Sequence, residues 1–266
     1  MKVCSILGIL NVTPDSFFDG GKSFSTQKAI DCAFEMHEAG ADFIDIGGES
    51  TRPESQPISA TEELDRILPV IEAVASKMPV SVDTQKAIVM KEVLKHPVAM
   101  INDVNALRDP GALSCVARAS VKLCLMHMKG VPQTMQEDPG YADVVHEVYG
   151  FLVSRVKECK SFGIELDRII LDPGFGFGKS VDDNYKLLSD LEYFNSLGCD
   201  VMIGMSRKSM IGNVLDLPVK ERLNGGIVLA CMALERGAKY IRTHDVKETK
   251  QAILLYQQLK EKEYVN

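Results

Sequence analysis

The feature that most constrains the fold of this chain is a regular alternation of short apolar runs with longer segments of helical periodicity. Apolar residues run almost continuously through several of the short runs, which is typical of parallel strands covered on both faces. The predicted strands are residues 5–10, 42–46, 80–83, 98–103, 122–126, 168–172, 200–204 and 239–243. The predicted helices are residues 26–39, 61–76, 85–95, 110–119, 142–162, 181–195, 220–236 and 246–260.

Eight strand–helix units in 266 residues predict an α/β fold, a single (β/α)8 TIM barrel spanning residues 1–266. An open doubly wound sheet shows the same alternation, but the number of units and the lack of an early GxGxxG motif favour the closed barrel. Gly40, Gly198 and Gly237 indicate where three of the helices end. Long loops at 11–25, 47–60 and 127–141 all follow strands, which is where barrel enzymes place their chemistry.

The charge and the cysteines limit the partners and the compartment. A net charge of −7 argues against nucleic acid as a partner, although a small anionic ligand needs only a few local cations. No apolar stretch approaches the ~18 residues of a membrane span, so no membrane partner is expected. Seven cysteines, without a CxxC pair, indicate buried thiols in a reducing compartment and predict a cytoplasmic protein.

Polar side chains stand at nearly every carboxyl end of the predicted strands. They are Asn11, Asp45, Asp83, Asn102, Asp103, His127, Asp172, Ser206, Arg207, Lys208, Arg242, Thr243, His244 and Asp245. A single Asp before a helix is more often an N-cap than a catalyst. Capping does not require Asn, Lys, Arg and His as well, and the strand ends of a barrel converge on one mouth. The pattern therefore predicts a binding or catalytic site there.

The segment 172–180, DPGFGFGKS, has two interpretations. It resembles a nucleotide phosphate loop, but Pro173 stands where that loop requires glycine, which argues against it. The favoured interpretation is a turn that holds Asp172 at the barrel mouth and lets Phe177 face a ligand. A plain strand-to-helix turn is the alternative.

Eight motifs in order make the chain resemble the dihydropteroate synthase family over essentially its whole length. They are residues 8–17 (GILNVTPDSF), 45–53 (DIGGESTRP), 81–84 (SVDT), 101–104 (INDV), 126–130 (MHMKG), 172–179 (DPGFGFGK), 206–209 (SRKS) and 242–246 (RTHDV). The resemblance implies a transferase of folate biosynthesis that joins 6-hydroxymethyl-7,8-dihydropterin diphosphate to p-aminobenzoate. The products are 7,8-dihydropteroate and diphosphate. The resemblance also implies a (β/α)8 barrel, a homodimer, a Mg2+ cofactor and a target of sulfonamides.

The resemblance assigns site residues, and elementary chemistry agrees with it. The pterin-binding residues are Asp83, Asn102, Met126, Asp172 and Lys208. The diphosphate-binding residues are Asn11, Thr51, Arg52, Arg242 and His244, with Asn11 also the metal ligand. The p-aminobenzoate-binding residues are Phe17, Thr51, Pro53, Phe177, Ser206 and Lys208. The catalytic residues are Asp83, Lys208, Arg242 and His244. A carboxylate accepts the adjacent N–H donors of a pterin edge as a bidentate pair, and fixed cations stabilise a departing diphosphate.

The weak basicity of the anilinic amine favours a dissociative displacement, in which diphosphate leaves before the amine attacks. Two other functions remain open at this point: a pterin-dependent methyltransferase barrel and a non-catalytic pterin-binding paralogue. Each should lack part of the anion-binding set, which is complete in this sequence. The chain departs from the family at Glu54, where glycine is usual, so the loop around it is the least certain part of the predicted site.

Overall fold

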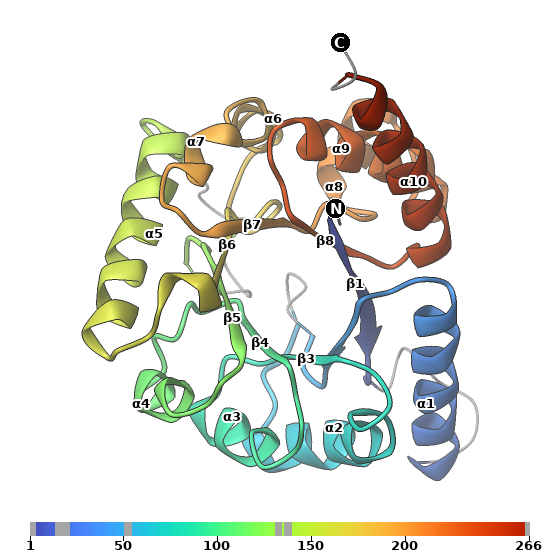
Figure 1. Cartoon of the computed structure of the whole chain (residues 1–266), viewed down its shortest axis with the longest axis vertical. Helices are drawn as coiled ribbons and strands as arrows, with labels where there is room; N and C mark the ends of the chain where they lie inside the picture. Colours follow the sequence, from blue (N-terminus) through green and yellow to red (C-terminus); the bar gives the residue numbers. More distant parts are fainter. Residues whose placement is uncertain (1–3, 14–21, 51–54, 131–134, 136–139, 264–266) are drawn as a thin grey trace.

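The eight predicted strands form a closed parallel barrel in the order of the sequence, from β1 round to β8 (Figure 1). The computed structural model describes residues 4–13, 22–50, 55–130, 135 and 140–263. The strands are β1 Ser5–Asn11, β2 Phe43–Gly47, β3 Val80–Asp83, β4 Met100–Asp103, β5 Lys122–Met126, β6 Ile169–Asp172, β7 Asp200–Ile203 and β8 Tyr240–Thr243. The closed barrel is confirmed, and the open sheet is excluded.

The helices form a ring around the barrel, as the view along it shows (Figure 1). The α-helices are α1 Lys22–Glu38, α2 Ala60–Val74, α3 Ala87–Val93, α4 Ala112–Ala117, α5 Val144–Ser161, α6 Val181–Ser189, α7 Glu192–Asn195, α8 Ser209–Leu215, α9 Leu223–Glu235 and α10 Val246–Glu263. Two short 3-10 helices, η2 Leu166–Arg168 and η3 Val219–Glu221, join them. In the described part of the chain, no helix has both the length and the hydropathy needed to cross a membrane.

Three helix predictions were wrong. The predicted helix 181–195 is two helices, because the backbone leaves helical geometry at Asp190 and turns Leu191 into the core. The short helix α8 was not predicted, since seven residues are too few to show a helical period. Helix α1 begins at Lys22, four residues before the predicted start at 26. The glycine signals were correct: Gly40, Gly198 and Gly237 have positive φ angles of 105°, 73° and 87°.

Apolar side chains fill the interior of the barrel below its mouth, and polar side chains lie above them at the carboxyl ends of the strands. The interior cluster consists of Leu7, Met100, Cys124, Ile170, Met202 and Tyr240. A larger apolar layer lies between the strands and the helices. Since strand side chains alternate, the next inward-facing position toward the carboxyl end on several strands is a polar residue. The filled interior therefore serves as the floor of the candidate site.

Candidate active site

The strand register brings the predicted residues to one level of the barrel. Gly47 of β2 lies opposite Asp83, and Asp83 lies opposite Asn102 on β4. Met126 of β5 lies opposite Asp172 of β6. Asp83, Asn102, Met126 and Asp172 are all buried. The structure thus places these four predicted pterin-binding residues at the carboxyl ends of neighbouring strands.

The guanidinium of Arg242 joins two carboxylates at the centre of the mouth. Its Nε donates to Asp45 Oδ2 at 2.6 Å, and its Nη2 donates to Asp83 Oδ2 at 2.7 Å. Asn102 Nδ2 donates to the same Asp45 oxygen at 3.1 Å. Asp45 therefore binds two predicted site residues, Arg242 and Asn102, from one fully buried position. Asp45 was predicted at a strand end, but no role was predicted for it. Asp45 and Gly47 are two residues apart on β2, and this spacing indicates that both face the barrel interior.

Acidic groups outnumber basic ones in this cluster, because the carboxyl groups of Asp45 and Asp83 share the one guanidinium of Arg242. Burial raises the pKa of Asp83 to about 7, and the nearby Arg242 opposes that rise. Burial also opposes the charge on Arg242, but Asp45 and Asp83 together hold the pKa of Arg242 above its ordinary value. Asp45 Oδ1 is buried and has no hydrogen-bond partner within the described residues. The cluster is therefore suited to a ligand that is polar or develops positive charge.

Asp172 is oriented by the loop that follows it. Its Oδ1 accepts the Gly174 N–H at 2.7 Å. Burial raises the pKa of the Asp172 carboxyl, while Lys208 opposes the rise. Gly174 has a φ of +73°, and a Cβ there would lie 1.8 Å from the His127 carbonyl oxygen. Only glycine allows the chain to turn so close to the end of β5.

The contacts of Lys179 decide between the two interpretations of the 172–180 segment. Its ammonium is 3% exposed and donates to Gly174 O at 2.9 Å and to Phe177 O at 3.0 Å. It also lies 3.0 Å from His127 Nδ1. Burial lowers the pKa of Lys179 to about 7. Because this lysine is directed at acceptors of the protein itself, the phosphate-loop interpretation is wrong.

Lys208 and Phe177 pack together beside the ends of β6 and β7. The Lys208 ammonium donates to the Phe175 carbonyl and lies 4.5 Å from the centroid of the Phe177 ring. Burial lowers the pKa of Lys208 to about 8. Phe177 in turn packs against a small apolar cluster that includes Met126. The structure thus brings together Met126, Phe177 and Lys208, as predicted.

A strained turn holds Lys208 in place. The preceding Arg207 has a φ of 60°, a conformation that non-glycine residues rarely adopt. Its side chain pairs with Asp245 through Nε at 3.2 Å, and its carbonyl accepts Arg222 Nη1 at 3.2 Å. These contacts fix the turn between β7 and α8 from two sides.

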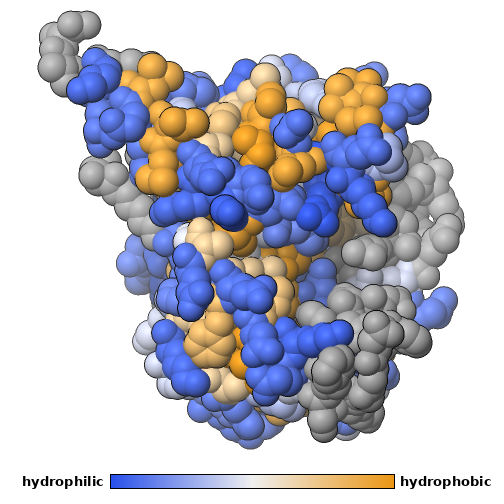
Figure 2. Space-filling view, turned by 90° about the vertical axis from the view of Figure 1, so that its right-hand side faces the viewer, coloured by the Kyte–Doolittle hydropathy of each residue, from blue (hydrophilic) through white to orange (hydrophobic). Residues whose placement is uncertain are grey.

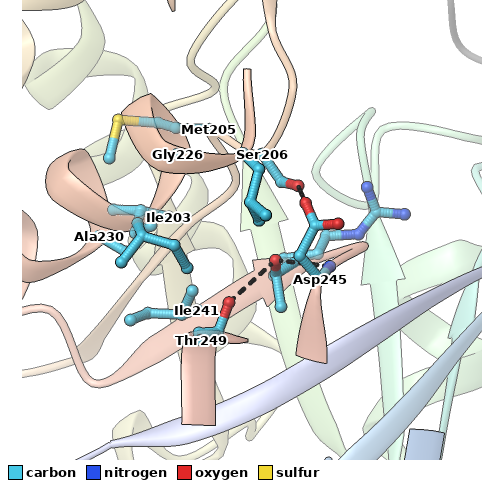
Figure 3. A pocket seen from close by; sticks show the side chains of 12 residues that line it. Ile203, Met205, Ser206, Gly226, Ala230, Ile241, Asp245 and Thr249 are labelled. Atoms are coloured by element: carbon cyan, nitrogen blue, oxygen red, sulfur yellow. Dashed lines mark hydrogen bonds between the residues drawn. The ribbon is translucent and has the colours of Figure 1, made fainter. Parts of the chain in front are cut away.

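Ser206 and His244 meet beside the end of β8. Ser206 Oγ lies 3.1 Å from His244 Nδ1 and accepts the His244 backbone N–H at 3.2 Å. Figure 3 shows the Ser206 hydroxyl directed at the Asp245 carboxylate, with Thr249 lower in the view and apolar side chains that include Ile203 to the left. These side chains line a small cavity behind the end of β8. The predicted aminobenzoate residue Ser206 therefore adjoins the predicted diphosphate residue His244.

The remaining predicted residues follow the first two strands in the sequence. Asn11 ends β1, opposite Gly47. Phe17, Thr51, Arg52 and Pro53 lie outside the described residues, as does Glu54.

Hydrogen bonds and ion pairs hold the two ends of the 47–60 loop. Glu49 Oε1 accepts the Ile58 N–H at 2.9 Å, and Glu49 Oε2 pairs with Lys86 at 2.9 Å. Lys86 also pairs with the fully buried Glu63 at 2.6 Å. Glu49 therefore ties the start of this loop to the residues just before α2.

Comparison with known proteins agrees with this geometry. Residues 7–244 match the model of the family described as pterin binding enzyme. The chain belongs to this family. The dihydropteroate synthase of Haemophilus influenzae is 48% identical over 259 residues, which are 97% of this chain and 94% of that protein. The resemblance found in the eight motifs is confirmed.

Two solved structures resemble the whole chain. One is the Yersinia pestis dihydropteroate synthase with a sulfonamide drug complex, with a TM-score of 0.92 and 43% identity over 97% of this chain and 94% of that one. The other is the Xanthomonas albilineans dihydropteroate synthase in complex with 7,8-dihydropteroate. It has a TM-score of 0.88 and 42% identity over 97% of this chain and 94% of that one. Fold and sequence therefore point to the same family.

Proposed function

We propose that the chain is a transferase that condenses 6-hydroxymethyl-7,8-dihydropterin diphosphate with p-aminobenzoate to give 7,8-dihydropteroate and diphosphate. The observation that carries the proposal is the convergence of Asp83, Asn102, Asp172 and Lys208 on one barrel mouth, in a chain of the pterin-binding enzyme family. The relatives described above are named for this activity, and one is in complex with its product. The step belongs to folate biosynthesis.

The pterin lies against the floor of the mouth. The Asp172 carboxylate, oriented by Gly174, accepts the adjacent N–H donors of the pterin edge. Asn102 and Lys208 donate to its acceptors, and Met126 supplies an apolar wall. Asp83 faces the ring system, where the net negative charge of the Asp45–Arg242–Asp83 cluster favours a pterin that becomes cationic.

The diphosphate leaves from the side of β1 and β8. Arg242 and His244 stabilise the charge on the departing oxygens, together with Asn11, Thr51 and Arg52. Within the described residues, no three His, Cys, Asp or Glu side chains are grouped to hold a metal ion. Asn11 would hold Mg2+ through its amide oxygen, since Mg2+ prefers oxygen ligands and keeps several waters. Bound there, Mg2+ would neutralise part of the diphosphate charge.

The reaction exchanges one bond at the pterin methylene carbon. The C–O bond breaks, and its electron pair leaves with diphosphate. The amine nitrogen then forms the C–N bond and loses a proton. Because the amine is a weak nucleophile, departure precedes attack and the pterin carries the positive charge between the two steps. A series of substituted anilines tests this order: the rate should depend weakly on amine nucleophilicity, and a strong dependence would contradict it.

The aminobenzoate ring occupies the outer part of the mouth. Phe177 contacts one face of the ring, and Pro53, Phe17 and Thr51 lie on the loops around it. Ser206 and Lys208 line its edge, next to His244. This subsite is also where a sulfonamide would bind, in keeping with the drug complex of the Yersinia pestis relative.

The protein forms a homodimer through the outer face of its last helices. Several large apolar side chains are exposed there: Val228 and Met232 on α9, and Leu254, Leu255 and Leu259 on α10. Figure 2 shows apolar patches interrupting the hydrophilic surface in the upper part of the view, the end at which Figure 1 places α9 and α10. Leu255, 74% exposed, is a suitable probe. Leu255→Glu should give a monomer in light scattering, and a dimer of unchanged strength would contradict this interface.

A cytoplasmic location is supported by the cysteines. All seven are free thiols, four of them buried. Proteins of reducing compartments keep their cysteines in this form.

One assay separates the proposed activity from its rivals. The protein is incubated with the pterin diphosphate and Mg2+, with and without p-aminobenzoate, and diphosphate release is measured. The proposal predicts release that requires aminobenzoate. A methyltransferase or a non-catalytic pterin-binding protein would give no such release.

A further inference from the structure

A buried ion–dipole cluster around Lys179 lies under the loop that carries Phe177. The Lys179 ammonium contacts Gly174 O at 2.9 Å, Phe177 O at 3.0 Å and His127 Nδ1 at 3.0 Å, with His127 O farther away at 3.4 Å. An ammonium has three N–H donors, and the three nearest partners are all acceptors. The proposed reaction gives this lysine no role.

His127 has the protonation state that such a cluster needs. Burial, and then the charge of Lys179, lower the pKa of His127 to about 2, so the imidazole is neutral. Because an ammonium can only donate, Nδ1 is the acceptor in its contact with Lys179. Its ring packs edge-on against Phe151 at a centroid distance of 5.0 Å. The imidazole is therefore a fixed acceptor just after the end of β5.

The contacts of Lys179 determine where Phe177 lies. Other contacts hold the first part of the loop: the Phe175 side chain is fully buried, and the Gly176 N–H donates to Asn184 Oδ1 at 2.7 Å. At Phe177 itself, the backbone N–H donates to Gly174 O at 3.1 Å. Lys179 binds the carbonyls on both sides of this turn and ties them to β5. The Phe177 ring then packs on Lys208, whose ammonium binds Phe175 O.

We propose that Lys179 is a positioning residue, which fixes the Phe177 ring and thereby sets the affinity of the site for its aromatic second substrate. The inference rests on the proposed function for the role of Phe177. Lys179 itself touches no substrate, since it is buried beneath the loop. Its effect should therefore disappear when the Phe177 ring is removed, whereas a general loss of stability would not.

A double-mutant cycle tests the inference. The KM for p-aminobenzoate is measured at saturating pterin diphosphate in the wild type, Lys179→Met, Phe177→Leu and the double variant. Displacing a substrate-orienting group by about 1 Å can cost up to about 100-fold, so Lys179→Met should raise this KM about tenfold. In the Phe177→Leu background the same change should add almost nothing. Independent, multiplicative effects of the two changes would overturn the inference.

Two further variants keep the result unambiguous. Lys186→Met is the matched control, because Lys186 lies on the adjacent helix α6 with its side chain 61% exposed, and its KM should stay at the wild-type value. If Lys179→Met does not fold, His127→Phe removes one acceptor while keeping a ring, and it should raise the same KM by a smaller factor. An unchanged KM in a folded His127→Phe or Lys179→Met overturns the inference.

The cycle also separates this inference from the proposed function. If Phe177→Leu raises the aminobenzoate KM and Lys179→Met does not, the inference fails and the role of Phe177 stands. If Phe177→Leu leaves the KM unchanged, the assignment of Phe177 fails, and the inference fails with it.

Discussion

Replacing Asp45 by Asn isolates the charge of a strand-end residue for which no role was predicted. Asp45 Oδ2 accepts Arg242 Nε at 2.6 Å and Asn102 Nδ2 at 3.1 Å, and the side chain is fully buried. Asn has nearly the same shape and keeps an acceptor, but it removes the negative charge. Arg242 should then be held less firmly, and with it the diphosphate side of the mouth.

The expected size follows from the hydrogen bonds. A bond to a charged group contributes about 1.5–3 kcal/mol and a neutral one about 0.5–1.5 kcal/mol. In Asp45→Asn the guanidinium stays charged, so the bond is weakened rather than made neutral; a loss of about 1.4 kcal/mol corresponds to about tenfold. Asp45→Asn should therefore lower kcat/KM for the pterin diphosphate about tenfold. Asp45→Ala, which leaves a buried cation with one partner fewer, should also destabilise the fold by about 3–5 kcal/mol.

The assay is diphosphate release over a range of pterin diphosphate concentrations, with thermal unfolding as the stability measurement. Asp200→Asn is the matched control, because Asp200 is exposed at the start of β7, at the other end of the barrel. It should retain wild-type kinetics. If Asp45→Asn also retains the wild-type kcat/KM, the argument that Asp45 positions Arg242 is refuted.

Three further predictions concern the assigned residues. Asp172→Asn turns an acceptor pair into a mixed group, so the pterin Kd measured by calorimetry should rise; an unchanged Kd would count against the role of Asp172. His244→Ala should reduce turnover more than pterin affinity in steady-state and binding assays, and the reverse would remove His244 from the diphosphate subsite. Burial lowers the pKa of Lys208 to about 8, so pterin affinity should fall as pH rises through about 8. The unliganded protein should gain stability between pH 8 and 10.5, where only the unfolded chain binds that proton. Lys208→Met should lose the affinity trend and keep only part of the gain in stability, because burial lowers the pKa of Lys179 as well.

The barrel was predictable because its signals are local. Strands β3 and β5 have the predicted bounds, since each is a short apolar run ended by a polar side chain or a turn. The break between α6 and α7 was not predictable in this way. The residues around Asp190 keep a helical pattern, and the inward turn of Leu191 depends on the core it meets.

The site was predictable as a set of residues but not as a set of contacts. Parallel strands in register bring their carboxyl ends together, so polar strand ends indicated which side chains would gather. The partners of Arg242 could not be read from the chain, because Asp45 is 197 residues away in sequence. The contacts of Lys179 depend on a left-handed turn at Gly174 that passes against β5, and no spacing in the sequence indicates that approach.

In the proposed reaction the enzyme breaks the bond between the pterin methylene carbon and oxygen. An isotope label tests this cleavage directly. The substrate carries oxygen-18 at the bridging position between that carbon and the diphosphate, and the products are analysed by mass spectrometry. The account predicts that all the label leaves in diphosphate while p-aminobenzoate becomes attached to the pterin. Label retained in a hydroxymethylpterin product would show cleavage at phosphorus, and would contradict the account.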